Sequence, residues 1–263
     1  MLFAKPDELI SDLMQTSIVS VQTTDDREAA TSAISKYDLL ALPVVDSENR
    51  LVGIVTVDDA VDVIQEEATE DIEMMAAITP TDKPYLQIGV FSTFLSRIPW
   101  LIILMLSATF TGTIITHYEG ALSKMVILTA FIPLLMNTGG NAGSQTSVTV
   151  IRGLSLGELR MGNIFRILWK ELRVSILCGI VLAVVVFGKA MLLDRASASV
   201  SLVVALTVLA TVVIAKLVGA TLPILAKRLG FDPTVMASPF ITTIVDAVAL
   251  LIYFAIASSL LGL

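Results

Sequence analysis

Cysteine and histidine are almost absent from this chain. Its 263 residues include one cysteine, Cys178, and one histidine, His117. A single cysteine excludes an intramolecular disulfide, and because Cys178 lies in an apolar run we expect it to serve packing alone. His117 lies at the end of another apolar run, where we expect no proton-carrying role.

The N-terminus lacks the pattern of a secretory signal peptide. Residues 5–12 are polar, and no long apolar run follows them. We therefore expect the N-terminal region to stay in the cytoplasm.

Basic residues are scarce in the first 98 positions. This part holds six Lys or Arg and eighteen Asp or Glu, a net charge of −12, whereas residues 99–263 hold eleven and six, a net charge of +5. Because the N-terminal part has no basic patch, nucleic acid is excluded as a partner. Its acidic character favours cations instead.

Long apolar runs fill the second part of the chain. Hydrophobic residues make up 55% of the sequence, more than a soluble protein usually has. About 20 apolar residues are enough to cross a bilayer as a helix. The sequence therefore predicts an α-helical polytopic membrane protein, in contact with lipid, with five transmembrane helices at 99–118, 123–151, 169–193, 199–224 and 234–261.

The charges of the short connections predict the orientation of these helices. The connection 152–173 carries five basic residues, and the connection 225–233 carries Lys227 and Arg228. The turns at 119–124 and 188–198 carry fewer. By the positive-inside rule, the N-terminus and the two basic connections are cytoplasmic, and the C-terminus lies outside.

Residues 10–64 have the pattern of a small α/β unit. Two short apolar strands are expected, one in LPVVD at 42–46 and one at the start of LVGIVTVDD at 51–59. The apolar spacing before them predicts a helix between residues 25 and 37, capped by Thr24 or Asp25.

This pattern resembles a CBS motif, a nucleotide-sensing module. The resemblance implies that Thr56 and Asp59 contact ATP or a related adenine nucleotide. The alternative is that Thr56 ends a strand and Asp59 caps a helix. Because CBS motifs work in pairs and one is present, we expect a partner subunit or a further N-terminal segment to complete the domain.

The segment 57–77 predicts a helix with one apolar stripe and one acidic face. Apolar residues recur every three or four positions from Val57 to Met75. Acidic residues four positions apart, such as Asp58 and Asp62, repel each other. A solvated face tolerates that repulsion; the alternative is a bound hard cation, Mg²⁺ or Ca²⁺, held by oxygen ligands. The candidate ligands are Asp58, Asp59, Asp62, Glu66, Glu67, Glu70 and Asp71.

Asp246 lies near the middle of the last predicted span, about 18 Å from its cytoplasmic end at 1.5 Å per residue. Ionisable residues at this depth are costly and usually functional. Ser238 and Thr242 share its helical face, and we expect Pro239 to interrupt the helix between them. The result is a line of oxygens that leads to a carboxylate. Hydrogen bonding of Asp246 to a neighbouring helix is the structural alternative.

The second predicted span is interrupted by polar residues and glycines at the same depth. Irregular backbone is tolerated there only where protein or water satisfies it. The glycines, among them Gly139 and Gly140, permit either close helix packing or local unwinding that aims carbonyls into a cavity. Asn137, Asn141 and Gln145 place three amides on one face, and these amides need partners.

Lys216 lies within the fourth predicted span. We expect its side chain to extend along the helix until the ammonium group reaches the cytoplasmic surface.

The chain as a whole resembles the MgtE family of magnesium channels and transporters. The motifs that carry the resemblance are PLLMNTGGNAGSQ at 133–145, SPFITTIVD at 238–246 and EEATEDI at 66–72. The resemblance implies a homodimer with a pore on its two-fold axis. It also implies that the usual N-terminal helical domain and first CBS motif are absent here, and Ser238 stands where an amide is common in the family.

By this resemblance, Asp246 from each subunit faces the pore and holds a hydrated Mg²⁺. The implied pore residues are Asp246, Thr242, Ser238, Asn137, Gly139, Gly140 and Asn141. The acidic helix is expected to sense intracellular Mg²⁺ and to close the pore, with ATP as a further regulator.

Three classes of function fit these features unequally. The first is a Mg²⁺-selective channel of a bacterial plasma membrane, and the second is a secondary transporter that exchanges a divalent cation for H⁺ or Na⁺. The third, an intramembrane aspartyl protease, has little support because one aspartate lies in the spans and no nucleophile accompanies it, so we expect no enzyme. The expected domains are a partial CBS domain at 1–64, a connecting helix with its lead-in to the membrane at 57–98, and a pore domain at 99–263.

Overall fold

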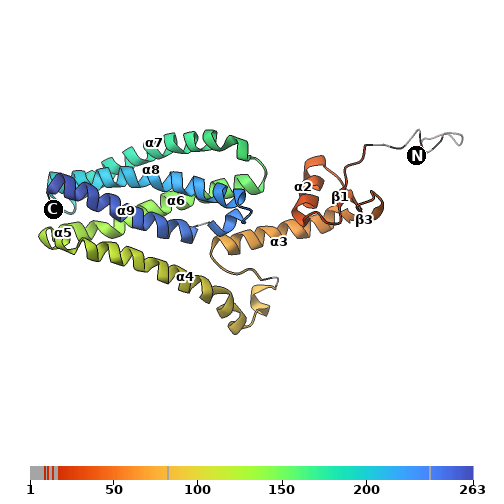
Figure 1. Ribbon diagram of the computed structural model, residues 1–263, viewed down its shortest axis with the longest axis horizontal. Helices are drawn as coiled ribbons and strands as arrows, with labels where there is room; N and C mark the ends of the chain where they lie inside the picture. The colour runs from red at the N-terminus through yellow and green to blue at the C-terminus, as the bar shows by residue number, and fades with distance from the viewer. Residues whose placement is uncertain are drawn as a thin grey trace. The chain divides into compact units, whose positions relative to one another are not determined.

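The computed structural model describes residues 9, 11 and 14 and residues 17–81, 83–236 and 238–262. The chain separates into two compact units, Met1–Glu70 and Asp71–Leu263 (Figure 1). The boundary falls within one long helix, α3 (Val57–Met75).

The first unit contains a three-stranded sheet in the order β1-β2-β3. Strand β1 (Val21–Gln22) runs parallel to β2 (Ala41–Val45), and β2 pairs antiparallel with β3 (Leu51–Thr56). The hairpin between β2 and β3 is closed by Asp46, whose carboxylate accepts hydrogen bonds from the backbone N–H groups of Glu48 and Arg50. The two predicted strands are therefore confirmed.

Helix α2 (Arg27–Tyr37) connects β1 to β2, but the predicted cap was wrong. The N-cap residue is Asp26, and no side-chain hydrogen bond caps the helix. The Asp25 carboxylate instead accepts a hydrogen bond from the backbone N–H of Gln22, at 2.8 Å, and so closes the turn that follows β1.

The core of the first unit is small and its sheet is largely open. Val21, Ile34, Leu42 and Ala60 form the buried cluster. On β3, by contrast, Leu51, Val52 and Ile54 are at least 60% exposed. A three-stranded sheet with an uncovered apolar face buries little surface, as expected for half of a paired domain.

The second unit contains five helices that are long and apolar enough to cross a membrane, counted over the part of the chain that the structure describes. The first four spans are Val90–His117, Val126–Ser155, Ile164–Leu192 and Ala198–Arg228, and the fifth is Pro233–Leu261. These spans contain helices α4 (Val90–His117), α6 (Ile132–Ser155), α7 (Ile164–Leu192), α8 (Ala198–Arg228) and α9 (Ser238–Leu261). The predicted fold class, five membrane helices with a small α/β region, is confirmed.

The boundaries of the spans differ modestly from those predicted. Helix α4 starts nine residues earlier than the apolar run, because its first turns are amphipathic rather than uniformly apolar. Short elements complete the unit: η1 (Tyr85–Gln87), α5 (Glu119–Lys124), η2 (Val126–Phe131), η3 (Met161–Asn163) and η4 (Pro233–Met236).

Helix α8 is the centre of the membrane unit. It packs against α6, α7 and α9, and 56% of its most apolar window is buried. Helix α4 is peripheral, with 6% of the equivalent window buried, and it packs mainly on α9. Trp100 of α4 meets Phe240 edge-on, and Tyr118 stacks on Phe254 with ring centroids 4.4 Å apart.

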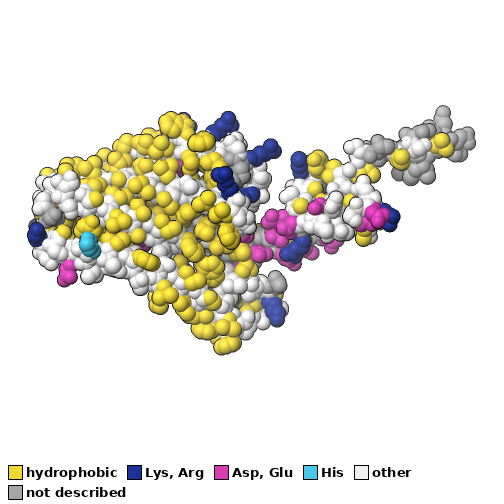
Figure 2. Space-filling model, in the orientation of Figure 1, with side chains coloured by type: hydrophobic (Ala, Val, Ile, Leu, Met, Phe, Trp, Pro, Cys, Tyr) yellow, Lys and Arg dark blue, Asp and Glu magenta, His cyan; other side chains and the backbone are white. Residues whose placement is uncertain are grey.

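The outer surface of the membrane unit is apolar and is bounded by charge at its ends. In Figure 2 hydrophobic side chains cover the visible faces of this unit, and most of its visible Lys and Arg side chains gather at one end. This arrangement is that of a protein surrounded by lipid with a basic rim at one interface.

Helices α6 and α8 meet through glycines. A Cβ atom added to Gly219 of α8 would overlap the carbonyl oxygen of Gly143, and one added to Gly143 would lie 3.1 Å from the carbonyl of Ala215. Without side chains at these positions the backbones touch directly, as small residues allow in membrane helices.

Gly219→Ala is expected to destabilise the membrane unit by about 1–3 kcal/mol, because the added methyl group forces α6 and α8 apart. The measurement is the thermal unfolding midpoint of the detergent-solubilised protein. Gly188→Ala, at a helical position of α7 with nothing within 4 Å of the added Cβ, is the matched control. Equal midpoints for the two variants would contradict the close packing.

Candidate functional site

The acidic helix α3 is exposed along most of its length. Ala60 is its buried residue, and it contacts the core of the first unit. The predicted apolar stripe is only half covered, since Val57, Val61 and Ile64 are between 40% and 47% exposed. A stripe left open beside an acidic face has surface available for a further partner.

Arg27 of α2 neutralises part of the acidic face, which the local sequence of α3 did not reveal. Its guanidinium lies 3.2 Å from Glu66 and 3.3 Å from Glu67. The partner is 39 residues away from Glu66 in sequence, so inspection of α3 alone could not find it. These two carboxylates are the ones among the seven candidates that a protein cation relieves directly.

Two carboxylates of α3 have shifted pKa values. Burial raises the pKa of Glu67, with a smaller contribution from the Glu28 carboxylate, while Arg27 acts in the opposite direction. A side-chain hydrogen bond from Thr56 and the backbone N–H of Asp58 lower the pKa of Asp58. Asp58 is thus fully ionised at neutral pH and suited to bind a cation.

Thr56 and Asp59, the residues implied in nucleotide binding, bond to each other. The Thr56 hydroxyl donates to the Asp59 carboxylate at 2.7 Å, directly where β3 ends and α3 begins. This contact is the one expected from the structural alternative, in which both residues organise a helix N-terminus. A nucleotide would have to compete with it, and the ATP role of this pair stays a prediction.

The sensing carboxylates do not converge in a single chain. Within the described residues no group of three or more His, Cys, Asp or Glu could hold a metal ion. The seven residues from Asp58 to Asp71 therefore remain predicted ligands, arranged along a helix rather than around a point.

In the membrane unit, the last span begins differently from the prediction. Helix α9 starts at Ser238, so Pro239 occupies its first turn and does not interrupt it. Proline is well suited to that position because the first N–H groups of a helix have no intrahelical partner. The Pro239 carbonyl accepts hydrogen bonds from the hydroxyls of Thr242 and Thr243, at 2.9 and 3.0 Å.

Asp246 lies at the middle of the fifth span and is half-buried. Thirteen residues of Pro233–Leu261 precede it and fifteen follow it. Thr242, one turn earlier, and Ser238, two turns earlier, are also partly buried. The three oxygen-bearing side chains therefore follow one face of α9 from its first residue to mid-span.

Helix α6 is continuous through its glycines, so the predicted unwinding was wrong. It runs unbroken from Ile132 to Ser155, and its carbonyls in this stretch serve the helix itself. The alternative, close packing, is what the structure contains. A Cβ on Gly139 would lie 2.6 Å from Thr211 and 2.8 Å from Val245, and one on Gly140 would lie 3.0 Å from Thr242.

The contacts of α6 with α9 define an antiparallel register. Ser144 and Ser238 are in hydrogen-bond contact at 2.9 Å, and four residues along each helix Gly140 lies against Thr242. One further turn brings Met136 and its neighbour Asn137 level with Asp246. The structure therefore brings together the amide segment of α6 and the carboxylate of α9 at the same depth.

The predicted amide face of α6 is exposed in the single chain. Asn137, Asn141 and Gln145 are all exposed, and the Asn141 amide donates to the Asn137 side-chain oxygen at 3.2 Å. Exposed amides in the middle of a membrane helix are unfavourable against lipid. This face thus needs water or another protein surface beside it. Gly139, by contrast, is buried and serves packing.

Lys216 does not reach the cytoplasmic surface, so that prediction was wrong. The residue is 7% exposed, and its ammonium group donates to the Thr146 hydroxyl at 3.2 Å. That hydroxyl in turn lies 3.1 Å from the Glu171 carboxylate of α7. Neither partner was recognised in the sequence, because both lie on other helices.

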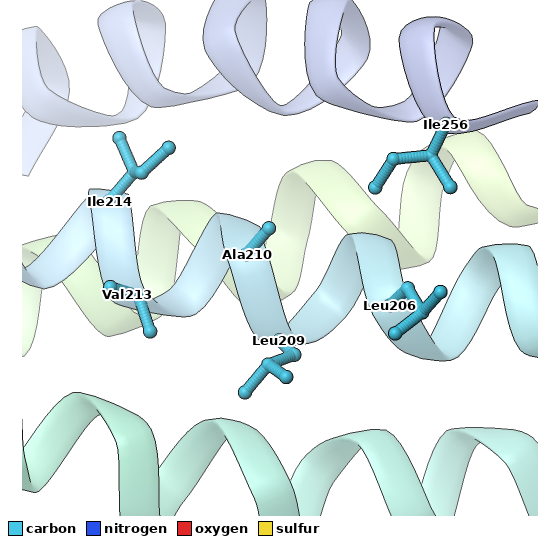
Figure 3. Close-up of a pocket in the computed structure, with 6 residues that line it drawn as sticks. All are labelled: Leu206, Leu209, Ala210, Val213, Ile214 and Ile256. Carbon is cyan, nitrogen blue, oxygen red and sulfur yellow. The ribbon is translucent and has the colours of Figure 1, made fainter. Parts of the chain in front are cut away.

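A groove on α8 is not a candidate for an ion. It has a volume of about 470 Å³ and is lined by Leu206, Leu209, Ala210, Val213, Ile214 and Ile256. Figure 3 shows that these side chains are all aliphatic and that Ile256 comes from α9. With no oxygen among its lining side chains, the groove could not ligate Mg²⁺.

These features define a class: a multi-pass membrane protein with a carboxylate, hydroxyls and amides gathered at mid-span and a small regulatory-type α/β unit. The family models agree. The MgtE model, described as a divalent cation transporter, matches residues 132–256, and the CBS domain model matches residues 10–66.

Curated relatives match almost the whole chain. Magnesium transporter MgtE of Thermus thermophilus is 37% identical over 99% of this chain, and that of Bacillus subtilis is 38% identical over 98%. The Enterococcus faecalis protein of the same name is 35% identical over 96%. The matches span 58%, 57% and 55% of these relatives' own lengths.

The chain belongs to the MgtE family. The relatives are named as transporters, in agreement with the expectation that the chain is no enzyme.

Proposed function

We propose that this protein carries Mg²⁺ down its electrochemical gradient across a bacterial plasma membrane, along the face formed by α6 and α9. The observation that carries the proposal is the mid-span position of Asp246, level with Asn137 and one turn from Thr242. Mg²⁺ keeps most of its waters and binds through one or two carboxylates. A single carboxylate flanked by hydroxyls and amides suits such a hydrated ion.

The pathway is completed by a second copy of the chain. The amide face of α6 and the Asp246 side of α9 are incompletely covered in one copy. A two-fold symmetric pair would place two such faces against each other and two carboxylates beside one ion. The homodimer therefore accounts for polar residues that lipid alone would disfavour.

The orientation follows from charge. The basic residues in the connections after α6 and after α8 place those ends in the cytoplasm, with the C-terminus outside. Labelling of a cysteine introduced at exposed Gly157 only from the outside of intact cells would contradict this orientation.

Asp246→Asn is expected to lower Mg²⁺ uptake roughly 100-fold, because it removes the charge that compensates the ion's lost hydration. Thr242→Val, which removes one hydroxyl of the same face, is expected to cost about tenfold. Uptake is measured in liposomes with an enclosed Mg²⁺-sensitive dye.

Glu119→Gln provides the matched control, since Glu119 is an exposed acid at the start of α5, outside the spans. Parent-like uptake by a well-folded Asp246→Asn protein would sink the assignment. An uptake that persists when membrane voltage alone drives it favours the channel; strict dependence on a H⁺ or Na⁺ gradient favours the exchanger.

Regulation by intracellular Mg²⁺ is proposed for the acidic face of α3. The support is its run of exposed carboxylates, of which Asp58, Asp59 and Asp62 have no ion-pair partner within 4 Å among the described residues. The end of α3 also contacts the start of the last span: the Thr234 hydroxyl of η4 lies 3.1 Å from the Met74 sulfur. Cation binding along α3 would thus bear on the helix that carries Asp246.

Replacing Asp58, Asp59 and Asp62 together with Asn is expected to raise the internal Mg²⁺ concentration that halves uptake by about tenfold, because fewer carboxylates hold the closing ion. Inhibition is measured in liposomes preloaded with graded Mg²⁺. Glu48→Gln, an exposed acid of the same unit away from α3, is the control. An unchanged inhibition curve for the triple variant would exclude these residues as the sensor.

A further inference from the structure

Three polar side chains connect α8, α6 and α7 inside the membrane unit. The Lys216 ammonium lies 3.2 Å from the Thr146 hydroxyl oxygen, and that oxygen lies 3.1 Å from a carboxylate oxygen of Glu171. Lysine can only donate, an ionised carboxylate can only accept, and a hydroxyl does both. The chain therefore has one direction: ammonium to hydroxyl, hydroxyl to carboxylate.

This arrangement balances a charge that would otherwise be isolated. Lys216 is 7% exposed and Thr146 is 2% exposed, so water does not solvate them well. Among the described residues Lys216 has no carboxylate within 4 Å. An uncompensated charge at this depth is costly, and removal of one member of a buried pair leaves the other unpaired. The Thr146 hydroxyl is the bridge that makes Lys216 and Glu171 a pair.

The bridge lies on the turn of α6 that faces all its neighbours. Ser144 contacts Ser238 of α9 at 2.9 Å, and Ser147 donates to the carbonyl of Met236, just before α9, at 3.3 Å. Thr146 lies between them in sequence and follows Gln145 of the amide face directly. Rotation of α6 about its axis would break all of these bonds together.

A second lysine of α8 holds the end of α6. The Lys227 ammonium donates to the carbonyl of Leu154 at 3.0 Å, where the last carbonyls of a helix lack intrahelical partners. Lys216 and Lys227 are eleven residues apart, about three helical turns. Helix α8 thus grips α6 at two points, one buried and paired with Glu171, the other at the helix end.

We propose that Lys216, Thr146 and Glu171 are positioning residues for the ion pathway: their charge-paired bridge holds α6 in the rotation that presents its amide face beside Asp246. They touch no ion themselves. This inference rests on the proposed function, since it assigns the bridge a role in the pathway of α6 and α9.

Four variants test the bridge. Lys216→Met and Glu171→Gln each leave one charge unpaired and are expected to lower Mg²⁺ uptake about tenfold and to raise the Mg²⁺ concentration for half-maximal uptake. The double variant Lys216→Met with Glu171→Gln removes both charges and is expected to recover most of the loss. Thr146→Ser, which keeps the hydroxyl, should behave like the parent.

The rescue distinguishes charge pairing from packing. If the residues served packing alone, the double variant would be worse than either single one, because two packing defects add. Single variants that keep the parent's half-maximal concentration, or a double variant with no recovery, would overturn the proposal. If a single variant fails to accumulate while the double one does, the pairing is equally supported.

A further variant and a reference protein keep the test decisive. Thr146→Val preserves both charges and nearly the same volume but removes the bridge, and parent-like uptake by this protein would overturn the proposal. Asp246→Asn is measured in parallel. Parent-like uptake by Asp246→Asn would show that the proposed pathway itself is wrong, whereas its loss together with unaffected bridge variants would reject the bridge alone.

Discussion

A carboxylate at the middle of a membrane span needs partners that lipid does not supply, and the arrangement of the membrane unit follows from that need. Asp246 has no basic residue on its own helix. Its surroundings come instead from α6, which approaches α9 closely because Gly140 and Gly143 have no side chains in the contact. Small residues here are therefore a condition for the site, since larger ones would move the amides of α6 away from the carboxylate.

The central position of α8 serves the same purpose from the other side. It contacts α6 through glycine and bonds it through lysine, and it also supports α7 and α9. A helix buried on most faces can hold a charged residue such as Lys216 only where partners are provided. Here Thr146 and Glu171 provide them, from two different helices. The polar residues that contact the proposed ion pathway and those that hold its walls are thus distinct sets.

The two units differ in how completely one chain satisfies them. The membrane unit has an extensive core that includes Leu135, Val208 and Phe254. The α/β unit leaves the apolar residues of β3 and the stripe of α3 half uncovered. Its acidic face is relieved by Arg27 at two positions and by no other described ion pair along α3. An incomplete unit with an open acidic helix is suited to respond to a cation or to a partner.

Much of the architecture could be predicted from local pattern. Apolar runs of sufficient length revealed the five spans, and short apolar segments between turn residues revealed β2 and β3. The depth of Asp246 followed from counting residues. What failed depended on contacts between distant residues: the Arg27 pairs, the bridge from Lys216, and the continuity of α6 despite its glycines. Pro239 was misjudged because its place within or before a helix depends on where that helix starts.

The most direct test of this account asks whether the amide face of α6 is wet. Asn141 can be replaced by cysteine in a Cys178→Ser background and exposed to a membrane-impermeant thiol reagent while Mg²⁺ uptake is followed. Val184→Cys, on a face of α7 that is 68% exposed and apolar, serves as the lipid-facing reference. The account predicts that the reagent modifies Cys at position 141 and blocks uptake, while position 184 stays unmodified. Equal protection of both positions would mean that α6 faces lipid, and the proposed pathway would be wrong.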